Sequence, residues 1–317
     1  MSRTRVRLIA AGCAIVALTG MSSQPLRGQA SGNGPTGPGQ GKPGKLPGTV
    51  STITVDSGRP WGWAVKAFME DPDRELYNTT KRKMLDGKQV FSQTITKLDV
   101  EGYCKGAAQY DFSRFEMQHT TMTFGDVEKM IAACPRVSAT PILRVPDATE
   151  TMVQHAVDLG VLGVIIPTVD DALESRQAAM FARFPPTGRR STGGGQAGSI
   201  WGPVIPKPQT FRNTINDNML VTVMIETLEG VKNALEIASQ PGVDVVIIGN
   251  ADFESFSGFG PTSPGYLDLQ TRVRNATYLA GKFWGNANSG FSTGNPLAAD
   301  SRFHLGVPPG KGPGATY

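Results

Sequence analysis

Two carboxylates in this sequence stand directly after apolar runs of the kind that form buried strands. Glu226 follows the run Leu220–Ile225, and Asp252 comes shortly after the run Val243–Ile248. Carboxylate oxygens without clustered cysteine or histidine favour a hard divalent cation that keeps open positions for water and substrate oxygens. The pair therefore predicts a site for Mg²⁺ or Mn²⁺, with Co²⁺ as an alternative.

An arginine and a histidine stand at the ends of two earlier apolar runs. A divalent cation acts as a Lewis acid on a chelating 2-oxo acid, and Arg144 can neutralise the enolate oxygen that then forms. His119 is the only imidazole expected at a strand end, which makes it the candidate proton carrier. Together with the carboxylates, these side chains predict an enolate-forming site.

One βαβ unit joins the two carboxylates. Residues Gly230–Ser239 are expected to form its helix, because apolar residues recur there at positions i, i+3, i+4 and i+7. The flanking strands must then run parallel, so both carboxylates emerge at the same carboxyl-terminal edge of one sheet. In α/β folds this edge is where sites are built.

Strands and single helices alternate from Asn78 onward. The expected strands are Val90–Ile95, Phe112–Met117, Thr140–Val145, Gly163–Thr168, Leu220–Ile225, Val243–Ile248 and Lys282–Asn286. The expected helices are Lys81–Leu85, Val100–Ala108, Phe124–Ala133, Thr151–Leu159, Asp171–Phe181, Gly230–Ser239 and Leu267–Ala280.

This alternation predicts an α/β fold, a (β/α)₈ TIM barrel, with an open doubly wound sheet as the alternative. No Gly-x-Gly-x-x-Gly turn follows the first strand, which disfavours an open sheet that binds a dinucleotide. The remaining barrel strand would have to come from Arg189–Gly195, although that segment has no strand character.

The amino-terminal residues have the pattern of a secretory signal peptide. Residues 1–30 carry an arginine-rich start, an apolar run and small residues at the end, so we expect an exported protein, periplasmic or secreted, with no integral membrane span after processing. A lipoprotein anchored through Cys13 is the alternative. Residues 31–48 are dominated by Gly and Pro and are expected to be a disordered linker. Residues 49–317 then form one barrel domain.

Net charge and cysteine content limit the kinds of partner and the compartment that we expect for the protein. The signal segment holds four arginines and no acid, so subtracting it from the net charge of +4 leaves a formally neutral protein, which gives no argument for nucleic acid or anionic membrane as partner. Cys104 and Cys134 remain after processing. They could pair in an oxidising compartment, yet each also falls where a helix would bury a small residue.

Several blocks of the chain carry a family resemblance. They are FEMQHTTMTFGDVEKMIAAC, PILRVPD, LGVLGVIIPTVDDA, FPPTGRRSTGG, VMIETLEGVKNALEIASQPGVDVVIIGNADFESFSG and AGKFWG, in this order. They resemble the HpcH/HpaI aldolase family of class II pyruvate aldolases. The resemblance implies that Glu226 and Asp252 are metal ligands, and that Arg144 stands next to the keto oxygen of the substrate. It also implies that the backbone amides of Ala251 and Asp252 hold the pyruvate carboxylate.

The same resemblance makes His119 the catalytic histidine, oriented by Glu116 in place of the usual aspartate. The implied reaction is cleavage of a 4-hydroxy-2-oxo acid to pyruvate and an aldehyde through a metal-stabilised enolate, in a homotrimer or homohexamer. Three residues depart from the family pattern: Gln118, Met224 and Ser191. Two other functions stay open, a citrate-lyase-like acyl-CoA lyase and a non-catalytic exported oxo-acid-binding protein.

Overall fold

The computed structural model describes residues 76–287, residue 297 and residues 301–307. The expected signal peptide, the Gly/Pro-rich linker and residues 49–75 of the expected domain lie outside the described residues. No helix in the described ranges is long and apolar enough to cross a membrane.

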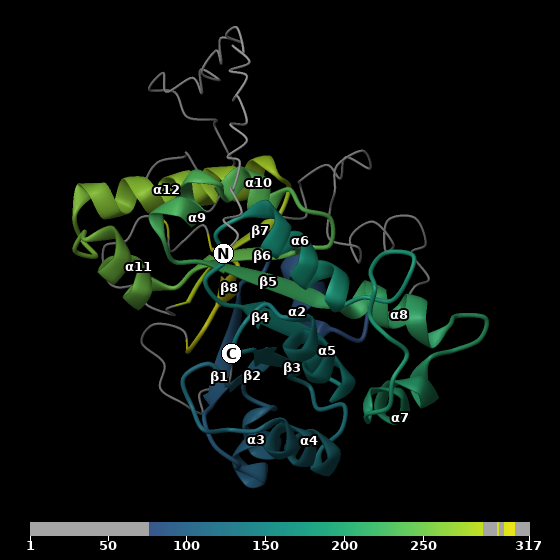
Figure 1. Cartoon of the computed structure of the whole chain (residues 1–317). Helices are drawn as coiled ribbons and strands as arrows, with labels where there is room; N and C mark the ends of the chain where they lie inside the picture. Colours follow the sequence, from purple (N-terminus) through teal and green to yellow (C-terminus); the bar gives the residue numbers. More distant parts are fainter. Residues whose placement is uncertain (1–75, 288–296, 298–300, 308–317) are drawn as a thin grey trace, which may run out of the picture. The chain divides into compact units, whose positions relative to one another are not determined.

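Eight parallel strands close into a barrel, and each strand pairs with its neighbours in the sequence (Figure 1). They are β1 (Val90–Ile95), β2 (Phe112–Glu116), β3 (Thr140–Arg144), β4 (Gly163–Ile166), β5 (Leu220–Ile225), β6 (Val245–Ile248), β7 (Phe283–Asn286) and β8 (Phe303–His304). The pairing of β8 with both β7 and β1 closes the ring. The (β/α)₈ barrel expected from the alternating pattern is thereby confirmed.

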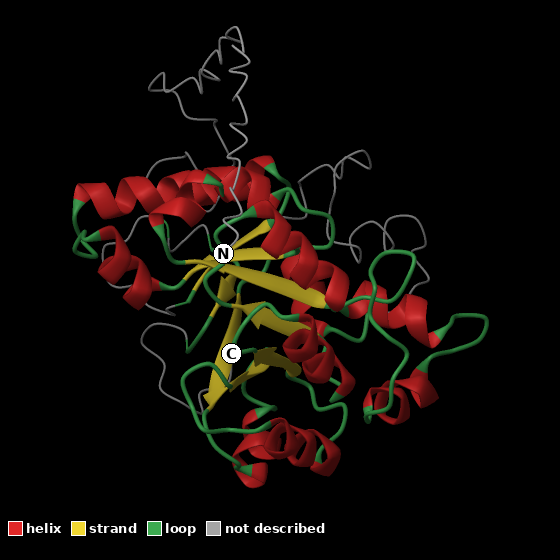
Figure 2. Cartoon of the chain, viewed as in Figure 1, coloured by secondary structure: helices red, strands yellow, loops and turns green. Residues whose placement is uncertain are grey.

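Helices surround the strands, as Figure 2 shows in red and yellow. They are α2 (Thr79–Leu85), α3 (Val100–Gly106), α4 (Phe124–Ala133), α5 (Glu150–Asp158), α6 (Ala172–Phe181), α7 (Ala197–Trp201), α8 (Phe211–Asn218), α9 (Leu228–Lys232), α10 (Ala234–Ala238), α11 (Asn250–Ser257) and α12 (Pro264–Leu279), with a 3₁₀ turn η2 (Gly202–Val204). Several begin at a side-chain cap, and α4 has a full capping box between Thr123 and Asp126. These caps explain why the helices start where the loops leave the strands.

Apolar side chains form two separate clusters. The larger one lies between the strands and the helices, and the smaller one fills the barrel interior, where Phe112 of β2 stacks on Phe303 of β8 with ring centroids 4.5 Å apart. Every residue of β5 is buried, as expected for a strand covered on both faces. The packed interior supports the strands whose carboxyl ends carry the candidate site.

Two sequence expectations were wrong. Arg189–Gly195 forms no strand, and the eighth strand comes instead from the two residues Phe303 and His304. His304 is fully buried and stacks on Phe91 with ring centroids 4.9 Å apart. The helix expected at Gly230–Ser239 is divided into α9 and α10 at Asn233, whose side-chain amide donates to the carbonyl of Asp170 at 2.8 Å.

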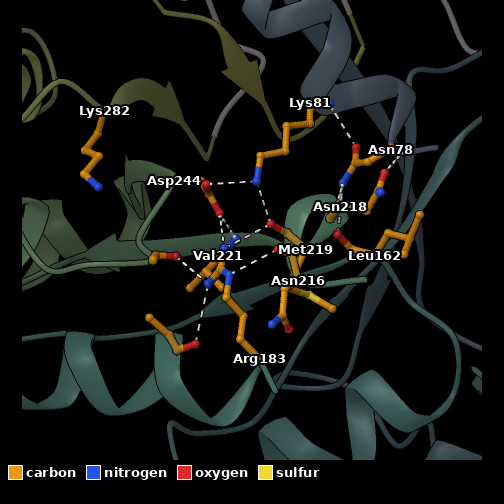
Figure 3. A network of polar contacts seen from close by, with 12 residues as sticks. Asn78, Lys81, Leu162, Arg183, Asn216, Asn218, Met219, Val221, Asp244 and Lys282 are labelled. Carbon is orange, nitrogen blue, oxygen red and sulfur yellow. Dashed lines mark hydrogen bonds and ion pairs between the residues drawn. The ribbon is translucent and has the colours of Figure 1, made fainter. Parts of the chain in front are cut away.

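A buried ionic network holds together the amino-terminal ends of β5 and β6 (Figure 3). The carboxylate of Asp244 lies 3.0 Å from the Lys81 ammonium and 2.8 Å from the Arg183 guanidinium, and it accepts the amide of Val221 at 2.8 Å. Asp244 also interacts with Lys282. Burial lowers the pKa of the Lys282 ammonium, and the negative charge of Asp244 opposes this shift in part. One buried carboxylate thus partly neutralises several cations at the end of the barrel opposite the strand carboxyl termini.

A disulfide joins Cys104 of α3 to Cys134, the residue that follows α4. The two cysteines are 30 positions apart, and their Cα atoms lie 5.8 Å from each other. Of the two alternatives left open by the sequence, pairing is the one that the structure shows. The bond links helix α3 to the end of helix α4, the two helices that precede and follow β2 in the chain.

Candidate active site

Glu226 lies directly after β5 and is 1% exposed. One of its carboxylate oxygens accepts two hydrogen bonds from Thr168, from the amide and from the hydroxyl, each at 2.8 Å. The other oxygen faces Gly249, where an added Cβ would come within 1.9 Å of it. The carboxylate therefore occupies a space that exists only because residue 249 has no side chain.

Asp252 lies in the first turn of α11, which begins directly after β6. Asn250 fixes this turn, because its side chain contacts the side chains of Asn286 at 2.5 Å and Tyr266 at 3.0 Å. The first amides of a helix have no partner within the helix and carry part of its positive dipole end. The amides of Ala251 and Asp252 therefore favour an anion at the place where the family resemblance implies the pyruvate carboxylate.

Arg144, the last residue of β3, pairs with Glu116, the last residue of β2. Its Nε lies 2.8 Å from the Glu116 carboxylate, and the two residues are also register partners in the sheet. Glu116 is 4% exposed and accepts the backbone amides of Gln118 at 3.0 Å and His119 at 3.4 Å. Its described contacts to His119 are to the main chain, so Glu116 positions the turn that carries the histidine and holds Arg144.

A cavity of about 310 Å³ at the carboxyl ends of the strands brings these groups together. Its lining includes all four strand-end residues predicted from the sequence, His119, Arg144, Glu226 and Asp252, together with Gly249, Asn250, Ala251 and Ala287. His119 is exposed and stands at the rim. The convergence predicted from strand ends is present.

Arg114 also lines the cavity, and sequence reasoning missed it. Strand β2 alternates, so Phe112, Arg114 and Glu116 project from the same face. Phe112 belongs to the barrel interior, and the same period of two places Arg114 inside the barrel. The alternation of β2 could have identified Arg114, because a charged residue on the inner face of a barrel strand is unusual and indicates a polar site.

The donor set fits a hard cation. Burial raises the pKa of the Glu226 carboxyl above its ordinary value, the hydrogen bonds from Thr168 oppose this, and the nearby charge of Asp252 adds to the rise. A divalent cation between the two carboxylates would offset that repulsion. Among the described residues no group of three or more His, Cys, Asp and Glu side chains gathers at one point. Two carboxylates fill only part of the coordination sphere of such an ion, which leaves positions for water and substrate oxygens.

The comparison with protein families decides what kind of barrel this is. Residues 104–293, more than half of the chain, match the model of the HpcH/HpaI aldolase/citrate lyase family. The chain belongs to the HpcH/HpaI aldolase/citrate lyase family. The matched range includes every predicted site residue, from Glu116 to Asp252.

Two curated relatives of this HpcH/HpaI chain are named aldolases, which are carbon–carbon lyases. The 2-keto-3-deoxy-L-rhamnonate aldolase of Shigella sonnei is 28% identical over 180 residues, which cover 54% of this chain and 66% of that protein, just under two thirds of its length. The 2-dehydro-3,6-dideoxy-6-sulfogluconate aldolase of Pseudomonas putida is 29% identical over 190 residues, which cover 60% of this chain and 71% of that protein.

Solved structures share the fold of the HpcH/HpaI chain. An HpcH/HpaI aldolase/citrate lyase family protein from Burkholderia cenocepacia J2315 superposes with a TM-score of 0.64 at 23% identity, covering 73% of this chain and 93% of that one. The citrate synthase SbnG gives a TM-score of 0.61 at 20% identity, covering 72% and 89%. At these identities the likeness shows the barrel alone.

Two of the residues that depart from the HpcH/HpaI pattern lie close to the site. Met224 is fully buried in the barrel interior, and its sulfur lies 3.9 Å from Nη1 of Arg144. Gln118 donates its amide to Glu116, and its side-chain oxygen is buried without a hydrogen-bond partner in the described part of the chain. Both residues therefore contact the pair Arg144 and Glu116, and the sulfur of Met224 also lies beside Gly249, as does one oxygen of Glu226.

Proposed function

We propose that this chain is a metal-dependent aldolase that cleaves a 4-hydroxy-2-oxo acid to pyruvate and an aldehyde. One observation carries the proposal: Glu226 and Asp252 meet Arg144 and His119 in a single cavity of about 310 Å³ at the carboxyl ends of the strands. The aldolase names of the two curated relatives support it.

Glu226 and Asp252 would hold Mg²⁺ or Mn²⁺. When bound, such an ion supplies Lewis-acid polarisation of the keto group of the substrate. Thr168 keeps one oxygen of Glu226 engaged, which leaves the other directed toward Gly249 and the cavity. The amides at the start of α11 hold the substrate carboxylate in this proposal, because they are the unsatisfied donors of the helix.

Arg144 stabilises the negative charge that develops on the keto oxygen when the C3–C4 bond breaks. The electron pair of that bond passes into the enolate of pyruvate, and the 4-hydroxyl group, after losing its proton, becomes the aldehyde carbonyl. A guanidinium fixed by Glu116 at 2.8 Å is already oriented for this role and needs no reorganisation.

His119 carries the protons. Cleavage requires a base for the 4-hydroxyl proton and an acid for C3 of the enolate, and His119 is the imidazole that lines this cavity. Its exposed position at the rim allows exchange of protons with solvent. Glu116 holds the turn of His119 through its backbone amide.

The test is the release of pyruvate from 4-hydroxy-2-oxo acids in the presence of Mn²⁺ or Mg²⁺. We expect turnover by the wild-type protein and its loss in Glu226→Ala. Glu229→Ala is the matched control, because Glu229 is an exposed acid of α9 three positions further on that pairs with Lys232. A folded wild-type protein that releases no pyruvate with any metal or substrate in the panel would exclude the aldolase.

A non-catalytic 2-oxo-acid-binding protein is the second candidate. The observation that favours it is Met224, an apolar side chain buried beside Arg144 where the family often keeps a polar substrate contact. Calorimetry distinguishes the two functions, because a binding protein takes up pyruvate or oxalate with metal and shows no lyase activity.

We also propose that the protein is exported and that it assembles as a trimer or hexamer. The disulfide between Cys104 and Cys134 supports an oxidising compartment, since such bonds persist there and are rare in the cytosol. Fractionation of cells with detection of the processed chain tests export. Light scattering of the purified protein tests the oligomer.

A further inference from the structure

A second cavity, of about 110 Å³, lies away from the candidate active site. Asp158 borders it and is the last residue of α5, the helix that precedes β4, so the cavity lies toward the amino-terminal ends of the strands. It shares no lining residue with the cavity that holds Glu226. The chemistry proposed above uses none of the side chains around it.

Arg190 is the buried cation of this second cavity, with a side chain that is only 2% exposed. Its Nη2 atom donates to the carbonyl of Val157 at 3.0 Å and to the carboxylate of Asp158 at 2.7 Å. A guanidinium has five N–H donors, and the other three are on Nε and Nη1. Both of these nitrogens are buried and have no acceptor within the described residues. Because buried donors without a partner are costly, they favour an anion from outside the chain.

The neighbours of the Arg190 guanidinium place it at the second cavity. Asp158, which it contacts at 2.7 Å, lines this space, and so does Phe184, whose ring centroid lies 4.5 Å from Cζ of Arg190. Arg212 also lines the space and approaches the same ring, with its Cζ 5.7 Å from the centroid. Two guanidinium groups therefore meet one carboxylate here, and the lining carries a net positive charge.

The glycine-rich segment 193–195 supplies main-chain donors beside these arginines. Gly195 has a φ of +79°, and a Cβ there would collide with the carbonyl oxygen of Asp158, so glycine is needed for the segment to pack against the end of α5. The amides of the segment donate to no acceptor in the described part of the chain. Thr192 adds a hydroxyl, which accepts from Arg212 at 2.7 Å. Successive amides next to arginine side chains are typical of phosphate-binding sites.

We propose that this second cavity binds one phosphate group between Arg190, Arg212 and the main-chain amides of residues 193–195. Pockets that enclose a whole organic ligand measure about 300–1,000 Å³, so a space of about 110 Å³ suits a single small group. The phosphate oxygens supply the acceptors for Nε and Nη1 of Arg190, and the planar guanidinium matches their geometry. Residues 191–195 are exposed, so the group is either the free ion or the end of a larger ester.

The competing explanation is that Arg190 is purely structural. In that case it fastens the segment after α6 to the end of α5 through Asp158, and it stacks on Phe184. The two explanations differ in what they require of Arg212, which is exposed. A phosphate site depends on this second guanidinium, whereas a structural contact between Arg190 and α5 does not.

The experiment is a calorimetric titration of the full, metal-free chain with inorganic phosphate and with glycerol 3-phosphate. We expect binding to the wild-type protein and an affinity at least about 10-fold lower in Arg212→Gln, the value of one hydrogen bond to a charged group. Arg190→Gln should lose at least as much. Arg189→Gln is the matched control, because Arg189 is the preceding residue, is exposed, pairs with Glu150 at 2.9 Å and does not line the cavity.

Two results would overturn the phosphate site. One is a folded wild-type protein that binds neither compound at millimolar concentration. The other is binding that stays unchanged in Arg212→Gln, which is also what phosphate held by Arg144 in the candidate active site would give. Tighter binding of the ester identifies the end group of a larger molecule, and tighter binding of the ion identifies free phosphate. If Arg190→Gln does not fold, Arg212→Gln decides alone. The aldolase proposal does not depend on any of these results.

Discussion

Thr168 and Glu226, 58 positions apart, are joined by two hydrogen bonds of 2.8 Å to the same carboxylate oxygen. Thr168 adopts a φ of +47°, a region that β-branched residues rarely enter. Such a conformation persists only where the surroundings hold it, and it is found at functional sites. The backbone after β4 is therefore shaped to orient the carboxylate that follows β5.

Thr168→Val removes the hydroxyl donor and keeps the shape of the side chain. Loss of a hydrogen bond to a metal-binding carboxylate typically costs about 10- to 100-fold in metal affinity, and we expect an effect in this range for Mn²⁺. Calorimetric titration with Mn²⁺ measures it, with the exposed Thr192→Val as control. An affinity equal to that of the wild-type protein would show that the hydroxyl does not support the site.

Gly249→Ala introduces a Cβ at 1.9 Å from one oxygen of Glu226 and 2.7 Å from the sulfur of Met224. Both neighbours are buried, so we expect Glu226 to be displaced and Mn²⁺ affinity to fall by more than about 10-fold. Gly260→Ala is the control, because a Cβ there meets nothing within 4 Å. Calorimetric titration of both variants with Mn²⁺ measures the difference in affinity. Equal affinities would show that Mn²⁺ binding does not require the close approach of Gly249 to Glu226.

The ionic network around Asp244 predicts a stability that rises with pH. Burial lowers the pKa of Lys81 to about 8 and that of Lys282 to about 7, with Asp244 opposing the shift and Arg183 adding to it. The ordinary value for lysine is 10.5. Between the lowered and the ordinary pKa the unfolded chain binds more protons than the folded chain, so the free energy of unfolding increases with pH in this window.

Urea unfolding at pH 7, 8 and 9 measures this increase. Substitution of Lys282 by Met removes one of the two titrating groups and should make the profile flatter. Lys232→Met is the control, because Lys232 is exposed on α9 and pairs with Glu229 at the surface. A free energy of unfolding that falls from pH 7 to pH 9 in the wild-type protein would contradict the prediction.

The disulfide predicts sensitivity of the fold to reduction. Its two cysteines close a loop with a sequence separation of 30, and a bond of this kind stabilises a domain by about 2–4 kcal/mol. We expect a reductant to lower the free energy of unfolding of the wild-type protein by this amount. The double substitution Cys104→Ser with Cys134→Ser should show the lower stability from the start and no response to reductant.

The barrel and four residues of the candidate site could be predicted from the sequence, because both depend on local patterns. Apolar runs mark strands, parallel strands end at one edge, and Arg144 and Glu226 stand at such ends. The disulfide could not be settled, because spacing alone does not show whether two cysteines approach each other. The break between α9 and α10 was also hidden, because it depends on a contact from Asn233 to the distant Asp170.

Contacts between distant segments account for the rest. The contact of Thr168 with Glu226 could not be predicted from the sequence, because it forms only when the loop after β4 lies beside the end of β5. The eighth strand consists of Phe303 and His304, a length below what periodicity can reveal. Arg114 could have been found, because the alternation of β2 already assigns it to the inner face.

The closing strand also imposes an order of events on synthesis. Phe303 is the register partner of Val90, more than 200 positions earlier in the chain. Until β8 has left the ribosome, β1 keeps a free edge of amide and carbonyl groups, which is the kind of surface that pairs with other chains. Ring closure therefore waits until the more than 200 residues between Val90 and Phe303 have been synthesised, and this edge of β1 stays unpaired with β8 until then.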